Sequence, residues 1–493
     1  MTKITIRRFD RNVVQALTNR GFPEPLARAL AARHVTSPSD LDYEFKEMLS
    51  PWDLKNCREA GEAIADAIWK QKKIVIIGDY DCDGATAVSV GILGLQALGA
   101  FNVSYLIPDR DKDGYGLSPQ LVDRAAAAGA ELIITVDNGI SSVAAVEHAK
   151  TLGIEAVVTD HHLPGDEIPD TLVVNPNQRG DTFPSKSLAG VGVIFYVLIA
   201  VRSALRAKGA YPNGKQPNLQ HLIDLVALGT VADVVPLDRN NRILVSKGLD
   251  SIRAGKMQPG VSALLSVAGK NANRISANDL GYILGPRINA AGRLDSINKG
   301  VECLTSYDYN TALFYAKELD QINAERRNRE VSMQSDAILS LQTISVDDSN
   351  SIVLKGDDWH AGIIGLVASR IKEQTYRPVI AFAPSEENGE HVLKGSGRSI
   401  PGIHLRDALD RVSKLSPGLI LKFGGHAMAA GLTIRKDAFD EFKELFARAV
   451  KELSDPEMFE RNIVTDGELR ASDFNIELVE AIRKHVWGQA FPE

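Results

Sequence analysis

Short apolar runs alternate with longer segments of helical periodicity through the first half of the chain. We expect a buried strand at each of five such runs, at residues 74–77, 103–107, 132–136, 156–159 and 172–175. The periodicity predicts helices at residues 59–70, 85–99, 119–128, 143–152, 191–208 and 219–231. Strands that alternate with helices are typical of βαβ units, so the pattern predicts an α/β fold around a largely parallel sheet.

The second half of the chain opens with a segment that lacks proline and glycine, residues 307–341, and that predicts one long helix joining two domains. Strands predicted at residues 351–355 and 378–382 and a helix at 439–453 indicate a second, smaller α/β domain. The predicted division is an N-terminal extension (1–50), a first domain (51–305), a connecting helix (306–345), a second domain (346–455) and a final fragment (456–493). The final fragment is shorter than the ~50-residue minimum size of a domain. We therefore expect the given sequence to be part of a longer protein.

Composition limits the class of protein. Hydrophobic residues make up 44% and charged residues 24%, which is ordinary for a soluble globular protein. No run of 18 apolar residues and no apolar segment behind the N-terminus occurs, so neither a membrane span nor a secretory signal is expected. Cys57, Cys82 and Cys303 are too far apart in sequence for a zinc or redox motif, which fits a reducing cytoplasm. The net charge of −7 argues against non-specific binding of duplex nucleic acid by the whole surface, and it is compatible with a local basic groove.

Acidic residues and histidines follow three of the predicted strands. They are Asp79, Asp81 and Asp83 after the first strand, Asp137 after the third, and Asp160, His161 and His162 after the fourth. Ligands of open α/β sheets bind at the carboxyl ends of the strands, so we expect all three sets at one edge. Acids gathered there repel one another unless cations lie between them. A solvated acidic turn is the alternative for a single Asp, but three separate sets make it the weaker explanation.

Two further residues border this set. Gly84 is expected to allow a sharp turn between the first acids and the helix at residues 85–99. Asp233 follows the helix at residues 219–231, and either joins the cluster or serves as a cap or turn residue.

The candidate ligands indicate the kind of metal. Carboxylates in this number favour Mg²⁺ or Mn²⁺, and one or two imidazoles shift the preference towards Mn²⁺, whereas zinc would need more nitrogen or sulfur. Because the ligands exceed the needs of one ion, we expect a site for two ions with Asp137 as a bridge. Such sites catalyse phosphoryl transfer. The sequence holds no P-loop, nucleophile elbow or GxGxxG fingerprint, so use of a nucleoside triphosphate or a dinucleotide is not expected.

Three glycine-rich segments carry side chains suited to an anion or to a catalytic approach. Residues 285–293 hold Arg287 and Arg293 in a predicted loop, and an ordinary surface loop is the alternative. Residues 394–399 are predicted to form a Gly/Ser turn, whose backbone N–H groups and Arg398 suit phosphate. Residues 423–431 place a histidine on a glycine-rich approach, for which a packed turn is the alternative.

The combination of motifs resembles a known family. Asp-x-Asp-x-Asp-Gly at residues 79–84, Asp-Asn-Gly at 137–139, Asp-His-His at 160–162 and Ala-Asp at 232–233 resemble the DHH phosphoesterase family. Gly-Gly-His-Ala-Met-Ala-Ala-Gly at 424–431 is similar to the DHH-associated C-terminal domain. Gly-Pro-Arg-Ile-Asn-Ala-Ala-Gly-Arg-Leu at 285–294 and Asp-Trp-His-x-Gly-Ile-Ile-Gly at 358–365 narrow the resemblance to the RecJ family, over about residues 50–490.

The resemblance implies a fold and a function. It implies a DHH catalytic domain joined by the long helix to a DHH-associated domain, followed by the start of an OB-fold. It implies a cytoplasmic, monomeric 5′→3′ exonuclease specific for single-stranded DNA, acting in DNA repair and recombination with a single-strand-binding protein and a helicase, and without a membrane. The alternatives are a phosphodiesterase for short oligoribonucleotides or cyclic dinucleotides, a pyrophosphatase, or a non-catalytic binding protein.

The resemblance also implies roles for single residues. Two Mn²⁺ or Mg²⁺ ions would be held by Asp79, Asp81, Asp83, Asp137, His161 and Asp233. His162 would lie beside the scissile phosphate, and Asp160 would orient the histidines. The DNA end would be contacted by Arg110, Tyr115, Arg287, Arg293, Ser396, Arg398, Gly425 and His426. Whether Asp79 binds metal directly stays open at this point.

Overall fold

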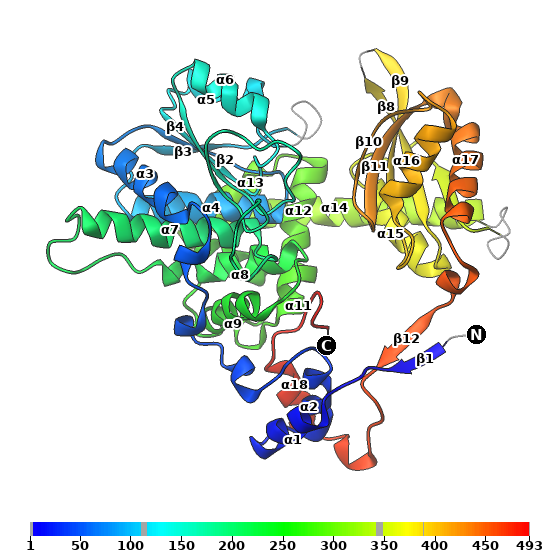
Figure 1. The fold of residues 1–493 in the computed structure, drawn as a ribbon, viewed down its shortest axis with the longest axis horizontal. Coiled ribbons are helices and arrows are strands. Elements are labelled where there is room, and N and C mark those ends of the chain that lie inside the picture. Colours follow the sequence, from blue (N-terminus) through cyan, green and yellow to red (C-terminus); the bar gives the residue numbers. More distant parts are fainter. Residues whose placement is uncertain (1–2, 110–115, 342–348, 388, 493) are drawn as a thin grey trace. The chain divides into compact units, whose positions relative to one another are not determined.

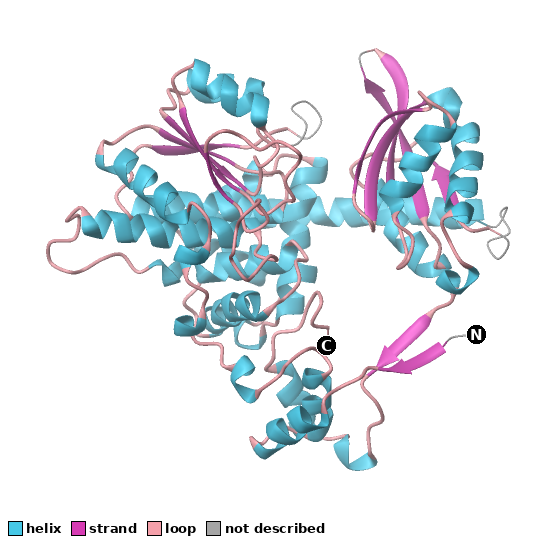
Figure 2. Ribbon diagram, in the orientation of Figure 1, coloured by secondary structure: helices cyan, strands magenta, loops and turns pink. Residues whose placement is uncertain are grey.

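A computed structural model describes residues 3–109, 116–341, 349–387 and 389–492 (Figures 1 and 2). The chain forms two units, each described by itself. The first unit contains Arg8–Asn323 and Asp466–Glu493, and the second contains Met1–Arg7 and Ala324–Thr465.

The first unit is built on a parallel sheet of five strands in the order β3-β2-β4-β5-β6 (Figure 2). Its strands are β2 (Ile74–Ile77), β3 (Val103–Leu106), β4 (Leu132–Val136), β5 (Glu155–Thr159) and β6 (Leu172–Val174). Each strand lies within one residue of a predicted run, so the expected parallel α/β sheet is confirmed.

Helices cover both faces of this sheet because its strands alternate apolar side chains between the faces. Odd-numbered residues of β2 pack on α5 (Pro119–Ala127) and α6 (Val143–Thr151). Even-numbered residues of β2 face the core that contains α3 (Cys57–Trp69), α4 (Cys82–Ala97) and α7 (Gly190–Ala207). Helix α7 has 18 residues and a mean hydropathy of 1.6, enough to cross a membrane by length and composition, but 67% of it is buried inside the protein. It is therefore a core helix.

A group of helices continues the first unit beyond the sheet. These are α8 (Ile223–Ala232), α9 (Arg239–Arg253), α10 (Pro259–Val267), α11 (Ala277–Asp279), the π-helical η6 (Leu280–Leu284), α12 (Gly285–Leu294) and α13 (Asn298–Thr305). The loop predicted at residues 285–293 is wrong, because this segment is helix α12. Its proline lies in the first turn, where the missing backbone N–H removes no helical hydrogen bond.

Both ends of the sequence contribute to the first unit. Helices α1 (Arg11–Asn19), α2 (Glu24–Ala31) and α18 (Ile476–Arg483) belong to it. Arg33 makes an ion pair of 2.9 Å with Asp466. The expectation that residues 456–493 begin an OB-fold remains a prediction.

The second unit is built on a mixed sheet of five strands in the order β10-β11-β9-β8-β7. Its strands are β7 (Ile352–Lys355), β8 (Val379–Glu387), β9 (Glu390–Arg398), β10 (Ile420–Gly425) and β11 (Ala429–Arg435), and its helices are α15 (Ile364–Thr375), α16 (Leu405–Leu415) and α17 (Phe439–Glu452). The Gly/Ser turn predicted at residues 394–399 is wrong, because β9 continues to Arg398 and pairs with strands on both sides. A Cβ on Gly395 would lie 2.5 Å from the Phe382 ring, so glycine there makes room for a core side chain.

The predicted long helix is α14 (Tyr309–Leu341), whose residues are divided between the two units. The second unit also holds a separate parallel pair of strands, β1 (Lys3–Ile6) with β12 (Asn462–Thr465). Residues from opposite ends of the sequence therefore pair there.

Asp224, a buried acid away from the sheet edge, makes the stability of the fold depend on pH. Asp224 lies in the first turn of α8, fully buried; the N–H of Gln258 donates to its Oδ2 at 2.6 Å, and its Oδ1 has no hydrogen-bond partner among the described residues. Burial raises the pKa of Asp224 from 3.8 to about 7, although backbone N–H groups oppose the shift. The folded protein therefore keeps a proton that the unfolded chain releases, and this carboxyl makes the fold less stable as pH rises from about 4 to 7.

Asp224→Asn is expected to raise the free energy of unfolding by about 1–3 kcal/mol near pH 8, and to change it little near pH 4. Urea unfolding of the variant and the parent at both pH values measures the difference. Asp250→Asn, an exposed acid on α9, serves as the control. Equal pH dependence in the Asp224 variant and the parent would refute the assignment.

Candidate metal centre

The first acids are positioned by the start of α4. Asp81 is the N-cap of this helix, and its Oδ1 accepts the N–H of Gly84 at 2.9 Å. Gly84 therefore lies inside the first turn of α4, and the predicted sharp turn at this glycine is wrong. A Cβ on Gly84 would lie 2.4 Å from the backbone oxygen of Asp79, so the glycine permits a close approach instead.

Asp83 links α4 to the N-terminus of α7. Its side chain is buried, and its two oxygens accept the N–H groups of Gly190 at 2.7 Å and Val191 at 3.0 Å. These are the first N–H groups of α7, which have no partner within the helix and which carry the positive end of its dipole. The start of α7 thus fixes a carboxylate that precedes it by more than a hundred residues.

Asp137 follows β4 with a backbone φ of +61°, an uncommon conformation that Asp tolerates better than most residues. Its side chain is buried. A Cβ on Gly190 would lie 2.5 Å from the Cβ of Asp137, so Gly190 must lack a side chain for Asp137 to occupy this place. Gly190 was not among the predicted site residues, and its only signal in the sequence is its place directly before an apolar helix.

Asp160 orients the two histidines that follow it. Its Oδ1 accepts the N–H groups of His161 at 2.7 Å and His162 at 3.1 Å, and lies 2.8 Å from Nδ1 of His162. Its Oδ2 accepts the N–H of Ile140 at 2.9 Å. With both oxygens engaged by protein donors, Asp160 is suited to holding the imidazoles rather than a metal ion.

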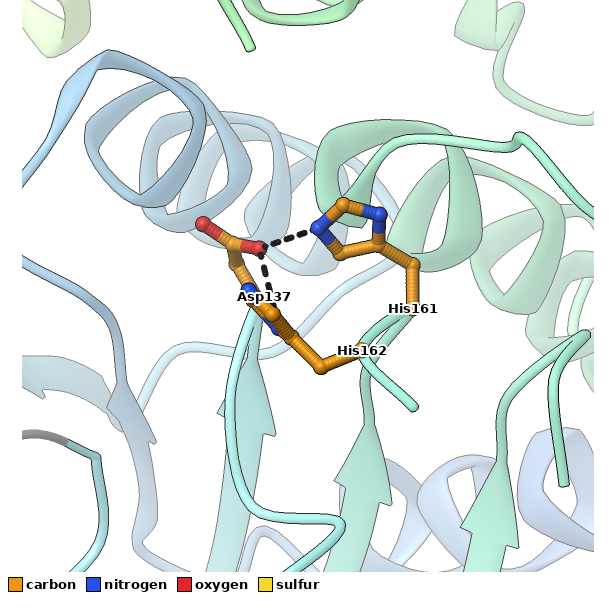
Figure 3. A group of neighbouring side chains, drawn as sticks. All are labelled: Asp137, His161 and His162. Atoms are coloured by element: carbon orange, nitrogen blue, oxygen red, sulfur yellow. Dashed lines mark ion pairs between the residues drawn. The ribbon is translucent and has the colours of Figure 1, made fainter. Parts of the chain in front are cut away.

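Side chains from three other parts of the chain converge on Asp137. Nε2 of His161 lies 3.1 Å from Oδ1 of Asp137 and 3.5 Å from Oδ2 of Asp233, and Nδ1 of His162 lies 4.0 Å from the same Asp137 oxygen. Figure 3 shows both imidazoles directed towards the Asp137 carboxylate. Three groups of residues offer ligand atoms within 4.8 Å of one another: Asp79, Asp81 and Asp137; Asp83, His161 and Asp233; and Asp137, His161 and His162. The structure thus brings together the six predicted metal ligands and His162.

The backbone beside Asp233 is strained. This residue caps the end of α8, and Val234, which follows it, has a φ of +62°. A β-branched side chain rarely adopts this left-handed conformation. Strain of this kind gathers at functional sites, where the surrounding structure holds it in place.

The acids of the cluster resist ionisation. Burial, and then the charge of Asp81, raises the pKa of Asp83 to about 7. Burial first and neighbouring acids second raise the pKa values of Asp79, Asp137 and Asp233 well above the usual range. Carboxylates in such a cluster become fully charged only when cations compensate them.

The two histidines differ in charge. Burial, and then the charge of His162, lowers the pKa of His161 to about 4, so this imidazole is neutral near pH 7. Burial lowers the pKa of His162, but the hydrogen bond and charge of Asp160 outweigh it and raise the pKa above the usual value. Burial also raises the pKa of Asp160, and the hydrogen bond and charge of His162 reverse this shift. Asp160 and His162 therefore behave as an ion pair.

The donor set fits divalent metal ions. Asp79 Oδ1, His161 Nε2 and Asp233 Oδ2 are buried and have no hydrogen-bond partner among the described residues. The neutral His161 imidazole places Nε2 3.1 Å from Asp137 Oδ1 and 3.5 Å from Asp233 Oδ2, so these three atoms can bind one metal ion together. Five carboxylates with one or two imidazoles match Mn²⁺ or Mg²⁺ better than zinc.

Helix α12 braces the loop that carries Asp79 and Asp81. Oδ1 of Asn289 accepts the N–H of Cys82 at 2.8 Å. A Cβ on Gly292 would lie 1.9 Å from the backbone oxygen of Tyr80, so the helix and the loop touch through their backbones. The glycine-rich motif was predicted to bind an anion, whereas the structure shows that two of its residues support the acidic loop.

The predicted DNA contacts have varied surroundings. Arg287 is buried, its Nη1 donates to the carbonyl of Ile283 at 2.6 Å, and its Nη2 lies 2.9 Å from Asp320. Arg293 is partly exposed on α12, and Arg110 and Tyr115 lie outside the described residues. Arg287 would have to leave two partners to bind DNA.

The remaining predicted contacts belong to the second unit. Ser396 and Arg398 lie on the same face of β9, where Nη1 of Arg398 is 3.2 Å from the Ser396 hydroxyl. Gly425 ends β10 with a φ of +137°, and His426 is exposed in the hairpin that follows. All four are close in this sheet, because β9 pairs with β11 and β11 pairs with β10.

Comparison with known proteins agrees with this geometry. Residues 73–230 match the N-terminal domain of the DHH family, and residues 348–452 match the DHHA1 domain. The chain is 50% identical to the single-stranded-DNA-specific exonuclease RecJ of Salmonella typhimurium over 480 residues, which are 96% of this chain and 82% of that protein. The chain belongs to the RecJ family.

Solved structures of RecJ show the same fold. The crystal structure of RecJ from Thermus thermophilus in complex with Mn²⁺ matches with a TM-score of 0.84 at 31% identity, over 100% of this chain and 69% of that one. The complex of the same protein with Mg²⁺ matches with a TM-score of 0.77 at 30% identity, over 100% of this chain and 67% of that one. RecJ structures thus contain both of the metals that the donor set of this chain favours.

Proposed function

We propose that this chain is a metal-dependent exonuclease that hydrolyses single-stranded DNA from its 5′ end and releases nucleotides. One observation carries the proposal: in a member of the RecJ family, the carboxylates and imidazoles of distant segments converge around Asp137 in three groups, and the ligand atoms of each group lie within 4.8 Å of one another. The identity of 50% to a single-stranded-DNA-specific exonuclease favours this activity over a phosphodiesterase for short oligoribonucleotides or cyclic dinucleotides.

We infer that two divalent ions, Mn²⁺ or Mg²⁺, occupy the cluster. One would be held by Asp79, Asp81 and Asp137, and the other by Asp83, His161 and Asp233, with Asp137 between them. When bound, two such ions activate a water molecule and neutralise the charge of the attacked phosphate. Oδ1 of Asp79 has no hydrogen-bond partner in the part of the chain that the structure describes, which supports a direct role for this carboxylate.

The residues around the ions would position the scissile phosphate. His162 is held by Asp160 at 2.8 Å and is 39% exposed, so it can reach a phosphate at the edge of the cluster. Its raised pKa lets it carry a proton and attract that phosphate. Because Asp160 fixes both histidines, it would set their direction without touching the DNA.

We further propose a set of contacts to the DNA end. They are Arg110, Tyr115, Arg287, Arg293, Ser396, Arg398, Gly425 and His426. The guanidinium and hydroxyl of Arg398 and Ser396, which are adjacent on β9, would suit a 5′ phosphate. We place the protein in the cytoplasm as a monomer that acts in DNA repair and recombination, with a single-strand-binding protein and a helicase as partners.

A labelling experiment tests the activity. Single-stranded DNA labelled at the 5′ or the 3′ end is incubated with the protein and Mn²⁺. Early release of mononucleotide label from the 5′ end alone is expected, together with loss of activity after chelation of the metal. Early release from the 3′ end would refute the polarity, and turnover of dinucleotides alone would refute the substrate class.

A further inference from the structure

The motif Asp-Trp-His-x-Gly-Ile-Ile-Gly at residues 358–365 leads into helix α15, and none of its residues belongs to the proposed DNA contacts. Its last residue, Gly365, is the second residue of this helix. Glycine weakens a helix relative to alanine, and the backbone φ of Gly365 does not lie in the left-handed region. The presence of glycine at this position therefore needs another explanation.

Two polar side chains of β9 occupy the space beside Gly365. A Cβ on Gly365 would lie 2.9 Å from Nη2 of Arg398 and 2.9 Å from the hydroxyl oxygen of Ser396. Both distances are shorter than the separation of about 3.5–4.0 Å that is usual for non-bonded heavy atoms. Glycine at this position thus allows the guanidinium and the hydroxyl to lie against the first turn of α15.

The two faces of β9 account for this arrangement. Gly395 and Gly397 face the hydrophobic core of the second unit, where added Cβ atoms would lie 2.5–2.7 Å from core side chains. Side chains alternate along a strand, so Ser396 and Arg398 point to the opposite face, where α15 begins. Both side chains stay partly exposed, whereas Gly365 is buried. A ligand can therefore reach the pair, and Gly365 supports it from below.

Two positively charged groups meet at this place. Nη1 of Arg398 donates to the carbonyl of Gly397 at 2.8 Å and lies 3.2 Å from the Ser396 hydroxyl oxygen, so the guanidinium is held in one direction. The start of α15 carries the positive end of the helix dipole, and the first N–H groups of a helix have no partner within it. A cation beside a helix N-terminus is unfavourable by itself, and an anion that touches both stabilises the arrangement.

A role in packing alone is the alternative for Gly365. Gly356 has such a role, because its Cβ would lie 2.3 Å from the ring of Trp359, a buried side chain. The neighbours of Gly365 are instead the ends of polar side chains, which can rotate away at little cost. A methyl group at residue 365 would therefore preserve the fold but change where the guanidinium lies.

We propose that Gly365 is a positioning residue for the recognition of the 5′ phosphate. Its missing side chain keeps the Ser396 hydroxyl and the Arg398 guanidinium against the start of α15, where they hold the phosphate together. This inference rests on the proposed function, which assigns both side chains to the DNA end. Gly365 itself acts through them and does not touch the DNA.

Gly365→Ala is tested on single-stranded DNA that carries either a 5′ phosphate or a 5′ hydroxyl group. We expect KM for the phosphorylated strand to rise about tenfold and kcat to change less than about twofold, because the lost contact is already made in the ground state. KM for the hydroxyl strand is expected to change less than about twofold. Gln374→Ala, an exposed position in the last turn of α15, is the control and should match the parent on both strands.

A double-mutant cycle with Arg398→Ala shows whether Gly365 acts through the guanidinium. In the Arg398→Ala background, Gly365→Ala is expected to change KM for the phosphorylated strand less than about twofold, because the contact is already lost. An undiminished phosphate preference in Gly365→Ala, an equal loss on both strands, or additive effects in the cycle would overturn the proposal.

A binding measurement separates this inference from the proposed activity. Fluorescence anisotropy of the two labelled strands in EDTA reports the phosphate preference without hydrolysis, and the Kd of Gly365→Ala is expected to rise about tenfold for the phosphorylated strand alone. A parent that binds both strands equally would refute the assignment of Ser396 and Arg398 to the phosphate, and with it this proposal. A parent that prefers the phosphate but hydrolyses neither strand in Mn²⁺ would refute the nuclease activity and leave the role of Gly365 supported.

Discussion

Asp137→Ala is expected to abolish hydrolysis of single-stranded DNA while leaving the fold intact. Asp137 shares a group of converging ligand atoms with Asp79 and Asp81, the proposed ligands of one ion, and its Oδ1 lies 3.1 Å from Nε2 of His161, a proposed ligand of the other. Its removal would therefore weaken the binding of both proposed ions. We expect kcat to fall by at least about 10³-fold, which corresponds to the several kcal/mol that metal ions contribute to such reactions.

The measurement combines single-turnover hydrolysis with calorimetric titration of Mn²⁺. Asp137→Asn is the informative companion, because Asn tolerates the φ of +61° and keeps one oxygen ligand but lacks the charge. Asp170→Ala, an exposed acid paired with Lys150, is the control. An active Asp137→Ala variant with normal Mn²⁺ binding would remove the assignment of this residue as the shared ligand.

The sheet and the edge where the acids meet could be predicted because both depend on local patterns. Apolar runs of four or five residues located every strand of the parallel sheet, and the rule that ligands bind at strand carboxyl ends placed Asp79, Asp137 and Asp160 together. Ligand atoms of Asp79, Asp81 and Asp137 within 4.8 Å of one another, and the 3.1 Å between His161 and Asp137, confirm that these strand ends converge. Asp233 could be placed only by resemblance to a family, because nothing in its own segment indicates which strand ends it faces.

Glycine-rich segments were the main source of error, and the reason is physical. Glycine serves both where the backbone needs a left-handed conformation and where two backbones come too close for a Cβ. Gly84 and Gly292, each in a helix, are of the second kind, and Gly395 in β9 makes room for the Phe382 ring in the same way. The sequence around such a glycine looks like a turn, since the neighbour that excludes the Cβ is distant in the sequence.

The contacts that hold the metal ligands in place could not be predicted either, because they also join segments that are distant in the sequence. The N–H groups of Gly190 and Val191 fix Asp83, and Asn289 fixes the N–H of Cys82. None of these contacts follows a periodicity, and each joins segments more than a hundred residues apart. They could be found only once the chain was folded, although they determine where the predicted ligands point.

Gly292→Ala is expected to lower kcat about 10–100-fold with little change in KM. The added Cβ would lie 1.9 Å from the backbone oxygen of Tyr80, and no side-chain rotation can relieve a contact with backbone. Helix α12 or the acidic loop must move, and a displacement of about 1 Å in a catalytic group can cost about 10²-fold in rate. Because Asp79 and Asp81 flank Tyr80, the same shift would weaken Mn²⁺ binding.

Steady-state kinetics at several Mn²⁺ concentrations distinguishes this effect from unfolding. If the loop has moved, a higher Mn²⁺ concentration should restore part of the lost rate, and the melting curve of the variant should remain cooperative. Gly165→Ala is the control, because its Cβ would meet its nearest neighbour, the backbone oxygen of Glu167, at an ordinary 3.7 Å. Parental kcat and Mn²⁺ affinity in the Gly292 variant would show that α12 does not brace the acidic loop. In that case the motif at residues 285–293 would instead serve to bind an anion through Arg287 and Arg293, as the sequence predicts.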